Sequence, residues 1–190
     1  MSGKLYTKIF NMRAKLVCET FREDSDPVED MGIGQRAMIK QWFKTWAPKA
    51  QYTIDDDFNV NVKGSLYLIR TPIAELPDNL TVKGSLYLAE TGITKLPDNL
   101  SVGGSLNLIR TPIAELPDNL TVKGSLYLLE TVITKLPDNL SVGGSINLIR
   151  TPIAELPDNL TVKGSLYLQR TRITELPYNL RVRGEIFKDF

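Results

Sequence analysis

The sequence contains no histidine and only one cysteine, Cys18. These absences exclude a Ser-His-Asp triad, a Cys-His pair, a histidine-ligated metal site and an internal disulfide bond. The formal net charge of the 190 residues is +1, so the chain as a whole has no strong electrostatic attraction to nucleic acids or anionic membranes. We therefore expect a protein that is not an enzyme and that needs no metal or cofactor.

Long apolar segments are also missing. The N-terminal residues MSGKLYTKIFNMRAKLVC are basic but lack a continuous apolar run and a small-residue cleavage site, so no secretory signal is predicted. No stretch is apolar enough to span a bilayer, and no membrane contact is expected. We predict a cytoplasmic, soluble protein. Translocation by a dedicated secretion system stays open, because such a chain would have the same composition.

A repeat of 20 residues dominates the rest of the chain. Leu66 and Leu68 alternate as in a short strand with one buried face. Pro77, followed by Asp78 and Asn79, indicates a turn. About six apolar side chains per unit then point inward, and each unit is one turn of a solenoid whose apolar edges only its neighbours cover. Six full units begin at Val62, Val82, Val102, Val122, Val142 and Val162, and a truncated seventh begins at Val182.

The motif L-x-L-x-x-T-x-I-x-x-L-P-x-x-L resembles the leucine-rich repeat. Its 20-residue period with Leu-Pro resembles the short bacterial subclass of type III secreted effectors and of similar bacterial and phage proteins. The resemblance covers residues 62–190 and implies an α/β solenoid with short parallel strands and a mostly irregular convex side. The family usually has asparagine where this sequence has Thr71 and its equivalents. A right-handed parallel β-helix is the competing fold for the same apolar pattern.

Residues 1–57 are predicted to form a helical N-terminal cap on a solenoid of residues 58–190. A cap would cover the first coil, and the effector family also carries one. The acidic stretch from Arg22 to Asp30 predicts a loop between two helices. We expect Trp42 and Trp46 in the core of the cap and Cys18 buried in its first helix. The apolar residues at helical spacing are Leu5, Ile9, Met12 and Leu16, then Met38, Ile39, Trp42, Phe43 and Trp46.

Three columns of side chains are predicted on the concave face, beside the inward leucines. An exposed stripe of aromatic and aliphatic residues indicates an interaction site, whereas stacking of these side chains along the ladder is the structural alternative. The first column is Tyr67, Tyr87, Asn107, Tyr127, Asn147 and Tyr167; the second is Ile69, Ala89, Ile109, Leu129, Ile149 and Gln169; the third is Arg70, Glu90, Arg110, Glu130, Arg150 and Arg170.

The third column alternates in charge over its first five members, which predicts ion pairs between adjacent coils. A companion column should pair in the same way: Glu75, Lys95, Glu115, Lys135 and Glu155. This alternation gives the repeats a super-period of 40 residues. The aspartates that precede each turn asparagine are interpreted as turn residues rather than metal ligands. A basic column of Lys63, Lys83, Lys123 and Lys163 would suit phosphate or RNA, but the neutral total argues against nucleic acid.

These observations predict a protein–protein interaction module that binds a protein partner on its concave face. The resemblance implies a bacterial or phage effector, or an inhibitor of a host or defence protein. Self-association is the alternative, through the apolar stripe or as a homodimer through the C-terminal edge. An enzyme would need an acid–base pair of Asp, Glu, Lys or Tyr in a closed pocket, which would have to form at the cap junction around Asp55, Asp56 and Asp57. The residues predicted to contact a partner are Tyr67, Tyr87, Tyr127, Tyr167, Ile69, Ile109, Leu129, Ile149, Arg70, Arg110 and Arg150.

Overall fold

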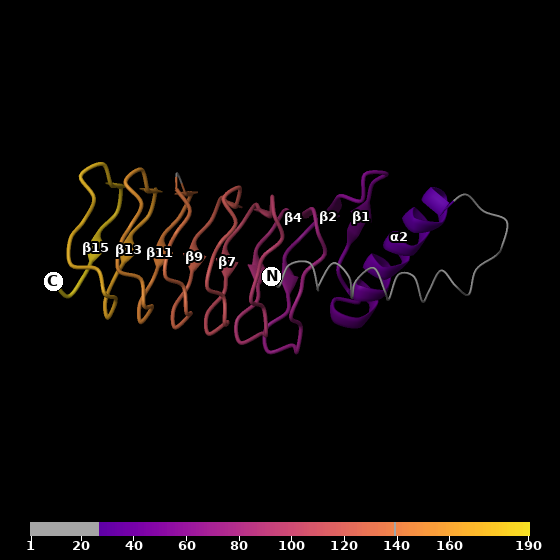
Figure 1. Cartoon of the computed structure of the whole chain (residues 1–190), viewed down its shortest axis with the longest axis horizontal. Coiled ribbons are helices and arrows are strands. Elements are labelled where there is room, and N and C mark those ends of the chain that lie inside the picture. The colour runs from indigo at the N-terminus through magenta and orange to yellow at the C-terminus, as the bar shows by residue number, and fades with distance from the viewer. Residues whose placement is uncertain (1–26, 139) are drawn as a thin grey trace. The chain divides into compact units, whose positions relative to one another are not determined.

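The structure is a computed structural model in which residues 27–138 and 140–190 are described. The chain divides into two compact units, Met1–Thr45 and Trp46–Phe190. The described part of the first unit is helical, and the second unit is a stack of short strands (Figure 1). No helix within the described ranges is long and apolar enough to cross a membrane.

Helix α2 spans Pro27–Trp46. Proline suits the first position of a helix, and basic Lys44 lies in the last turn, near the negative C-terminal end of the helix. The predicted loop therefore ends earlier than expected, because residues 27–30 already belong to the helix. Ile39 and Phe43 are buried as predicted.

The two tryptophans are less buried than predicted. Trp42 and Trp46 are half-buried, and the ring of Trp42 contacts that of Phe43 edge-on at 5.0 Å. Phe43, with 1% of its surface exposed, is therefore the more central residue. The predicted first helix and Cys18 lie outside the described residues.

The second unit is a β-solenoid in which each 20-residue turn contributes two short strands. One sheet has eight strands: β1 (Tyr52–Ile54), β2 (Val60–Val62), β4 (Leu80–Val82), β6 (Ser101–Val102), β8 (Thr121–Val122), β10 (Ser141–Val142), β12 (Thr161–Val162) and β14 (Arg181–Val182). The other has seven: β3 (Leu66–Tyr67), β5 (Leu86–Tyr87), β7 (Leu106–Asn107), β9 (Leu126–Tyr127), β11 (Ile146–Asn147), β13 (Leu166–Tyr167) and β15 (Ile186–Phe187).

Both sheets are parallel ladders with the register of the repeat. Leu66 pairs with Leu86, and Val62 pairs with Val82. Strand β1 is the exception, because it runs antiparallel to β2 and places Tyr52 opposite Val62. Figure 1 shows the coils stacked one on the next from β2 to β15.

The predicted parallel-strand solenoid is thus confirmed, but the second strand of each turn was not predicted. Leu80 and Val82 alternate with Thr81 as Leu66 and Leu68 alternate with Tyr67, so the segment after the turn also forms a half-buried strand. Within the described part of residues 47–190 no helix separates the strands. This part of the chain is therefore a β-solenoid rather than an α/β solenoid.

The core is built from the inward columns of the repeat. In the first turn Leu66, Leu68, Ile73, Leu80 and Val82 are each at most 2% exposed, and Leu76 is 9% exposed. The same positions are buried in the following turns up to Ile173. Burying each such side chain contributes about 1.5–3 kcal/mol before chain entropy is subtracted. The prediction of about six inward apolar residues per unit is confirmed.

Candidate functional site

A tight turn after every strand of the seven-stranded sheet except β15 directs the charged column outward. In the first turn the backbone N–H and the hydroxyl of Thr71 both donate to the carbonyl of Leu68, at 3.2 and 2.7 Å. Arg70, the residue before Thr71, has a left-handed φ of 57°. The equivalent hydroxyls of Thr91, Thr111, Thr131 and Thr151 are buried and make the same bond. Threonine therefore closes this turn in five successive coils.

The predicted charge ladder is present on this turn. Arg70 Nε lies 2.7 Å from Glu90 Oε2, and Arg110 Nη1 lies 3.4 Å from Glu90 Oε1. Glu130 is likewise shared, because Arg110 Nε and Arg150 Nη1 lie 2.6 and 2.5 Å from its two oxygens. Hydrogen bonds from Arg70 and from Arg110 are the main reason that the pKa values of Glu90 and Glu130, respectively, lie below the ordinary glutamate value.

The ladder ends at the sixth turn, and four residues of its predicted companion form no ion pair within the described part of the chain. Arg170 occupies the position where alternation would place a glutamate, and its backbone N–H donates to Asp189 Oδ2 at 2.7 Å. Among the described residues, none lies within ion-pair distance of the companion-column residues Lys95, Glu115, Lys135 and Glu155. The prediction of a second ladder is therefore wrong for these four residues.

The aromatic column stacks along the ladder. The rings of Tyr67 and Tyr87 are 4.8 Å apart and nearly parallel, and those of Tyr167 and Phe187 are 4.7 Å apart. Asn107 interrupts the column and accepts a hydrogen bond at its Oδ1 from the N–H of Ile109 at 3.0 Å; Asn147 does the same for Ile149. The stacking alternative is therefore confirmed for Tyr67 and Tyr87, and Phe187 extends the column beyond the predicted residues.

The apolar stripe is open at one end only. Tyr67 is 67% exposed and Ile69 is 45% exposed. The other predicted contact residues of the first two columns are half-buried: Tyr87, Tyr127, Tyr167, Ile109, Leu129 and Ile149. The prediction of a continuous exposed stripe is wrong, because neighbouring coils cover most of each side chain. We call the exposed end, formed by Tyr67, Ile69 and the stacked ring of Tyr87, the aromatic patch.

The corner between the two sheets carries a ladder that the sequence analysis missed. Ser65 Oγ accepts a hydrogen bond from the N–H of Ser85 at 3.0 Å, and the pattern repeats to Ser165 Oγ, which accepts from Glu185. A Cβ on Gly84 would lie 2.6 Å from the backbone nitrogen of Ser65. The Gly-Ser pair shared by the six full units was the signal, since only glycine fits where two backbones come this close.

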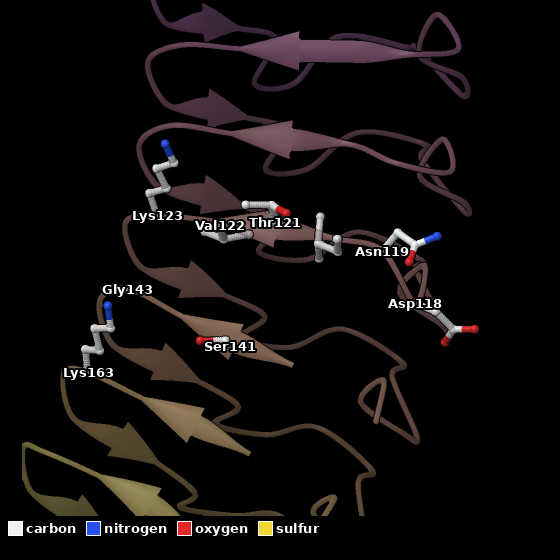
Figure 2. Close-up of a pocket in the computed structure, with 9 residues that line it drawn as sticks. Asp118, Asn119, Thr121, Val122, Lys123, Ser141, Gly143 and Lys163 are labelled. Atoms are coloured by element: carbon white, nitrogen blue, oxygen red, sulfur yellow. The ribbon is translucent and has the colours of Figure 1, made fainter. Parts of the chain in front are cut away.

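The eight-stranded sheet carries a polar surface, separate from the Arg–Glu ladder beside the other sheet. A shallow hollow of about 660 Å³ lies over its middle turns, and Lys123, Gly143 and Lys163 line one edge of it. Figure 2 shows the two lysines on the same side with Gly143 between them, and Asp118 at the opposite end. Exposed hydroxyl groups of Thr121 and Ser141 lie between these edges.

The acidic residues do not assemble a metal centre in the described ranges. No group of three or more histidine, cysteine, aspartate or glutamate side chains could hold a metal ion there. Of the three candidate acidic residues near the start of the solenoid, Asp55 accepts hydrogen bonds at Oδ1 from the N–H groups of Asp57 and Asn59, at 3.1 and 2.8 Å. The carboxylate of Asp55 therefore shapes a turn.

Comparison with known proteins gave no match. No family model, no curated protein and no solved structure is similar to this chain at a significant level. The resemblance to short leucine-rich repeats rests on the repeat motif alone.

Proposed function

We propose that this chain is a non-catalytic interaction module, related to the short leucine-rich repeats, that binds a protein partner at the aromatic patch. The observation that carries the proposal is the exposure of Tyr67 and Ile69, at 67% and 45%. Large apolar side chains are costly to leave in water, and exposed clusters of them commonly mark interaction sites. Tyrosine in particular is enriched among residues that dominate binding energy.

The side chains and the strand of the aromatic patch are held by contacts within the chain. Tyr67 is stacked on Tyr87, and the strand below it is held by the N–H groups of Leu66 and Leu68, which donate to Ser85 and Tyr87 at 2.9 Å. A side chain that is already ordered loses little conformational freedom on binding. Arg70 lies beside the patch with 74% of its side chain exposed, and it adds a charged rim.

The role of such a module is occlusion or scaffolding. The repeat motif resembles that of bacterial effectors and phage proteins, which supports a function as an effector or as an inhibitor of a host or defence protein. Self-association through the same patch is the competing proposal, because a second copy would bury the same tyrosine. Light scattering separates the two, since a monomer at all concentrations excludes self-association.

The test compares two matched double variants in affinity capture from a bacterial lysate. Tyr67→Ala with Ile69→Ser removes the aromatic patch. Tyr178→Ala with Val132→Ser removes a similar exposed area elsewhere on the solenoid, since Tyr178 is 100% and Val132 51% exposed. Circular dichroism confirms that both variants fold.

We expect the native chain to capture a protein, which is then purified. This protein should bind the native chain and the control variant equally and the patch variant about tenfold more weakly, which corresponds to about 1.4 kcal/mol of binding free energy. A partner that binds all three chains equally would contradict the proposed site. If the mass of the native chain rises with concentration and that of the patch variant does not, the patch binds a second copy of the chain rather than a different protein.

A further inference from the structure

The lysines beside the eight-stranded sheet form a regularly spaced column. Lys83, Lys123 and Lys163 directly follow strands β4, β8 and β12, and all three are exposed. Gly103 and Gly143 occupy the same position in the turns between them. Adjacent parallel strands are about 4.8 Å apart, so these lysines stand about 10 Å apart along the solenoid. Lys63 and Arg183 extend the column at its two ends.

The two glycines keep the space between the lysines open. A Cβ on Gly103 would overlap the carbonyl oxygen of Lys83, and a Cβ on Gly143 would overlap that of Lys123. No side chain can therefore fill these positions without a shift of the backbone. The hollow of about 660 Å³ lies at the second of these gaps, between Lys123 and Lys163 (Figure 2).

The three central lysines of the column have no acidic partner among the described residues. In the described part of the chain, no carboxylate lies within ion-pair distance of Lys83, Lys123 or Lys163. Asp118 lines the hollow but lies at the end opposite the lysines (Figure 2). This differs from the arginine column on the other sheet, where Glu90 and Glu130 accept the hydrogen bonds.

We propose that this surface binds a linear anionic polysaccharide that runs along the solenoid axis. Its carboxylate or sulfate groups pair with successive lysines, and its hydroxyl groups face the hydroxyls of Thr121 and Ser141 in the hollow. One exposed ion pair contributes little, but several on one polymer act together because each bound group holds the next near its site.

The chemistry of the surface favours a polysaccharide over single-stranded nucleic acid. Recognition of single strands combines positive charge with aromatic side chains on which the bases stack. Between Leu80 and Val162 the aromatic residues are Tyr87 and Tyr127, and both belong to strands of the other sheet. The surface beside the lysines therefore offers charge and hydroxyl groups but no stacking platform.

The experiment measures binding of the full chain to dextran sulfate, to polygalacturonate, to neutral dextran and to single-stranded poly(dT), at low and high salt. The test variant is Lys123→Gln with Lys163→Gln. The matched control is Lys95→Gln with Lys135→Gln, which makes the same change in net charge at two exposed lysines of another column.

We expect salt-sensitive binding to at least one of the two anionic polysaccharides, and the polymer that binds identifies the anionic group as sulfate or carboxylate. The test variant should bind about tenfold more weakly and the control within about twofold of the native chain. Failure to bind either polymer, an equal loss in both variants, or tighter binding of poly(dT) would each overturn the proposal.

Discussion

Arg110 and Glu130 are 20 residues apart in the sequence, yet Arg110 Nε donates a hydrogen bond to Glu130 Oε2 at 2.6 Å. Both residues have a left-handed φ, of 55° and 57°, so each projects from the same position of its turn. Glu130 also pairs with Arg150. The ion pairs therefore depend on the register in which the coils stack, and each pair can be tested by a separate substitution.

Glu130→Gln should lower the melting temperature at neutral pH, because it removes the charge that Arg110 and Arg150 share. The pKa of Glu130 is below its ordinary value in the folded chain, so its stabilising contribution is complete above the unfolded pKa of about 4.3 and is lost as the pH falls through the folded pKa. The difference in melting temperature between native and variant should accordingly be present at pH 7 and vanish in stronger acid.

Glu155→Gln is the control for that measurement. It removes the same charge from the companion column, where Glu155 forms no ion pair with a described residue. Its effect on the melting temperature should be smaller at pH 7. Equal effects of the two variants would show that the ladder adds nothing beyond net charge.

Removing one coil should alter the response to salt, whereas removing two should not. Deleting residues 102–121 places Glu90 beside Glu130, so an attractive contact becomes a repulsive one. Deleting residues 102–141 places Glu90 beside Arg150 and restores the alternation. Added salt screens both kinds of contact. Thermal unfolding at several salt concentrations should show stability falling with salt in the native chain and the two-coil deletion, and falling less or rising in the one-coil deletion.

The sign of the salt response, rather than stability itself, is the informative quantity. Both deletions lose stability because each coil supports its neighbours. If both deletions respond to salt as the native chain does, the 40-residue super-period has no electrostatic role.

The core and the Arg–Glu ladder could be predicted because each depends on a repeated residue type. A leucine or valine every 20 residues has one way to be buried when the coils stack, and opposite charges at one position must then meet. The second strand column was missed because Leu80-Thr81-Val82 is only three residues long and follows a proline turn. Such a short alternation does not distinguish a strand from an irregular segment.

The exposure of the aromatic column could not be predicted, because the motif does not tell which neighbours cover each ring; β3 is the terminal strand of its sheet, so Tyr67 has a neighbouring strand on one side only. Tyr67 and Tyr127 have the same place in the motif, but Tyr127 is half-buried and Tyr67 is 67% exposed. The prediction of ion pairs in the companion column was wrong for a similar reason, since alternation of charge does not reveal whether two side chains reach each other. Lys95 and Glu115 alternate as Arg70 and Glu90 do, but only the latter form an ion pair.

Ser125→Ala should cost about 1 kcal/mol of unfolding free energy, because the N–H of Ser145 would lose the acceptor that lies 3.0 Å away. Urea unfolding followed by circular dichroism measures this loss. Ser141→Ala is the matched control, since Ser141 is exposed and its hydroxyl makes no hydrogen bond among the described contacts. A control that costs as much as Ser125→Ala would show that the serine ladder is not stabilising.

Gly124→Ala should destabilise the solenoid, whereas Gly64→Ala should not, although both glycines hold the same place in the motif. A Cβ on Gly124 would lie 2.6 Å from the carbonyl carbon of Gly104 and 2.7 Å from the nitrogen of Ser105, and both are backbone atoms that cannot move aside alone. A Cβ on Gly64 has nothing within 4 Å. Overpacking of this kind typically costs roughly 1–3 kcal/mol, and an exposed substitution stays within about 0.5 kcal/mol.

The pair of variants separates two reasons for a glycine in every unit. If glycine is needed for its backbone freedom, both alanine variants should lose stability, since the local turn is the same. If glycine is needed because the next coil's backbone comes close to the one before it, only Gly124→Ala should be affected. Urea unfolding of the two variants decides between these, and equal losses would contradict the close approach that fixes the corner of each coil.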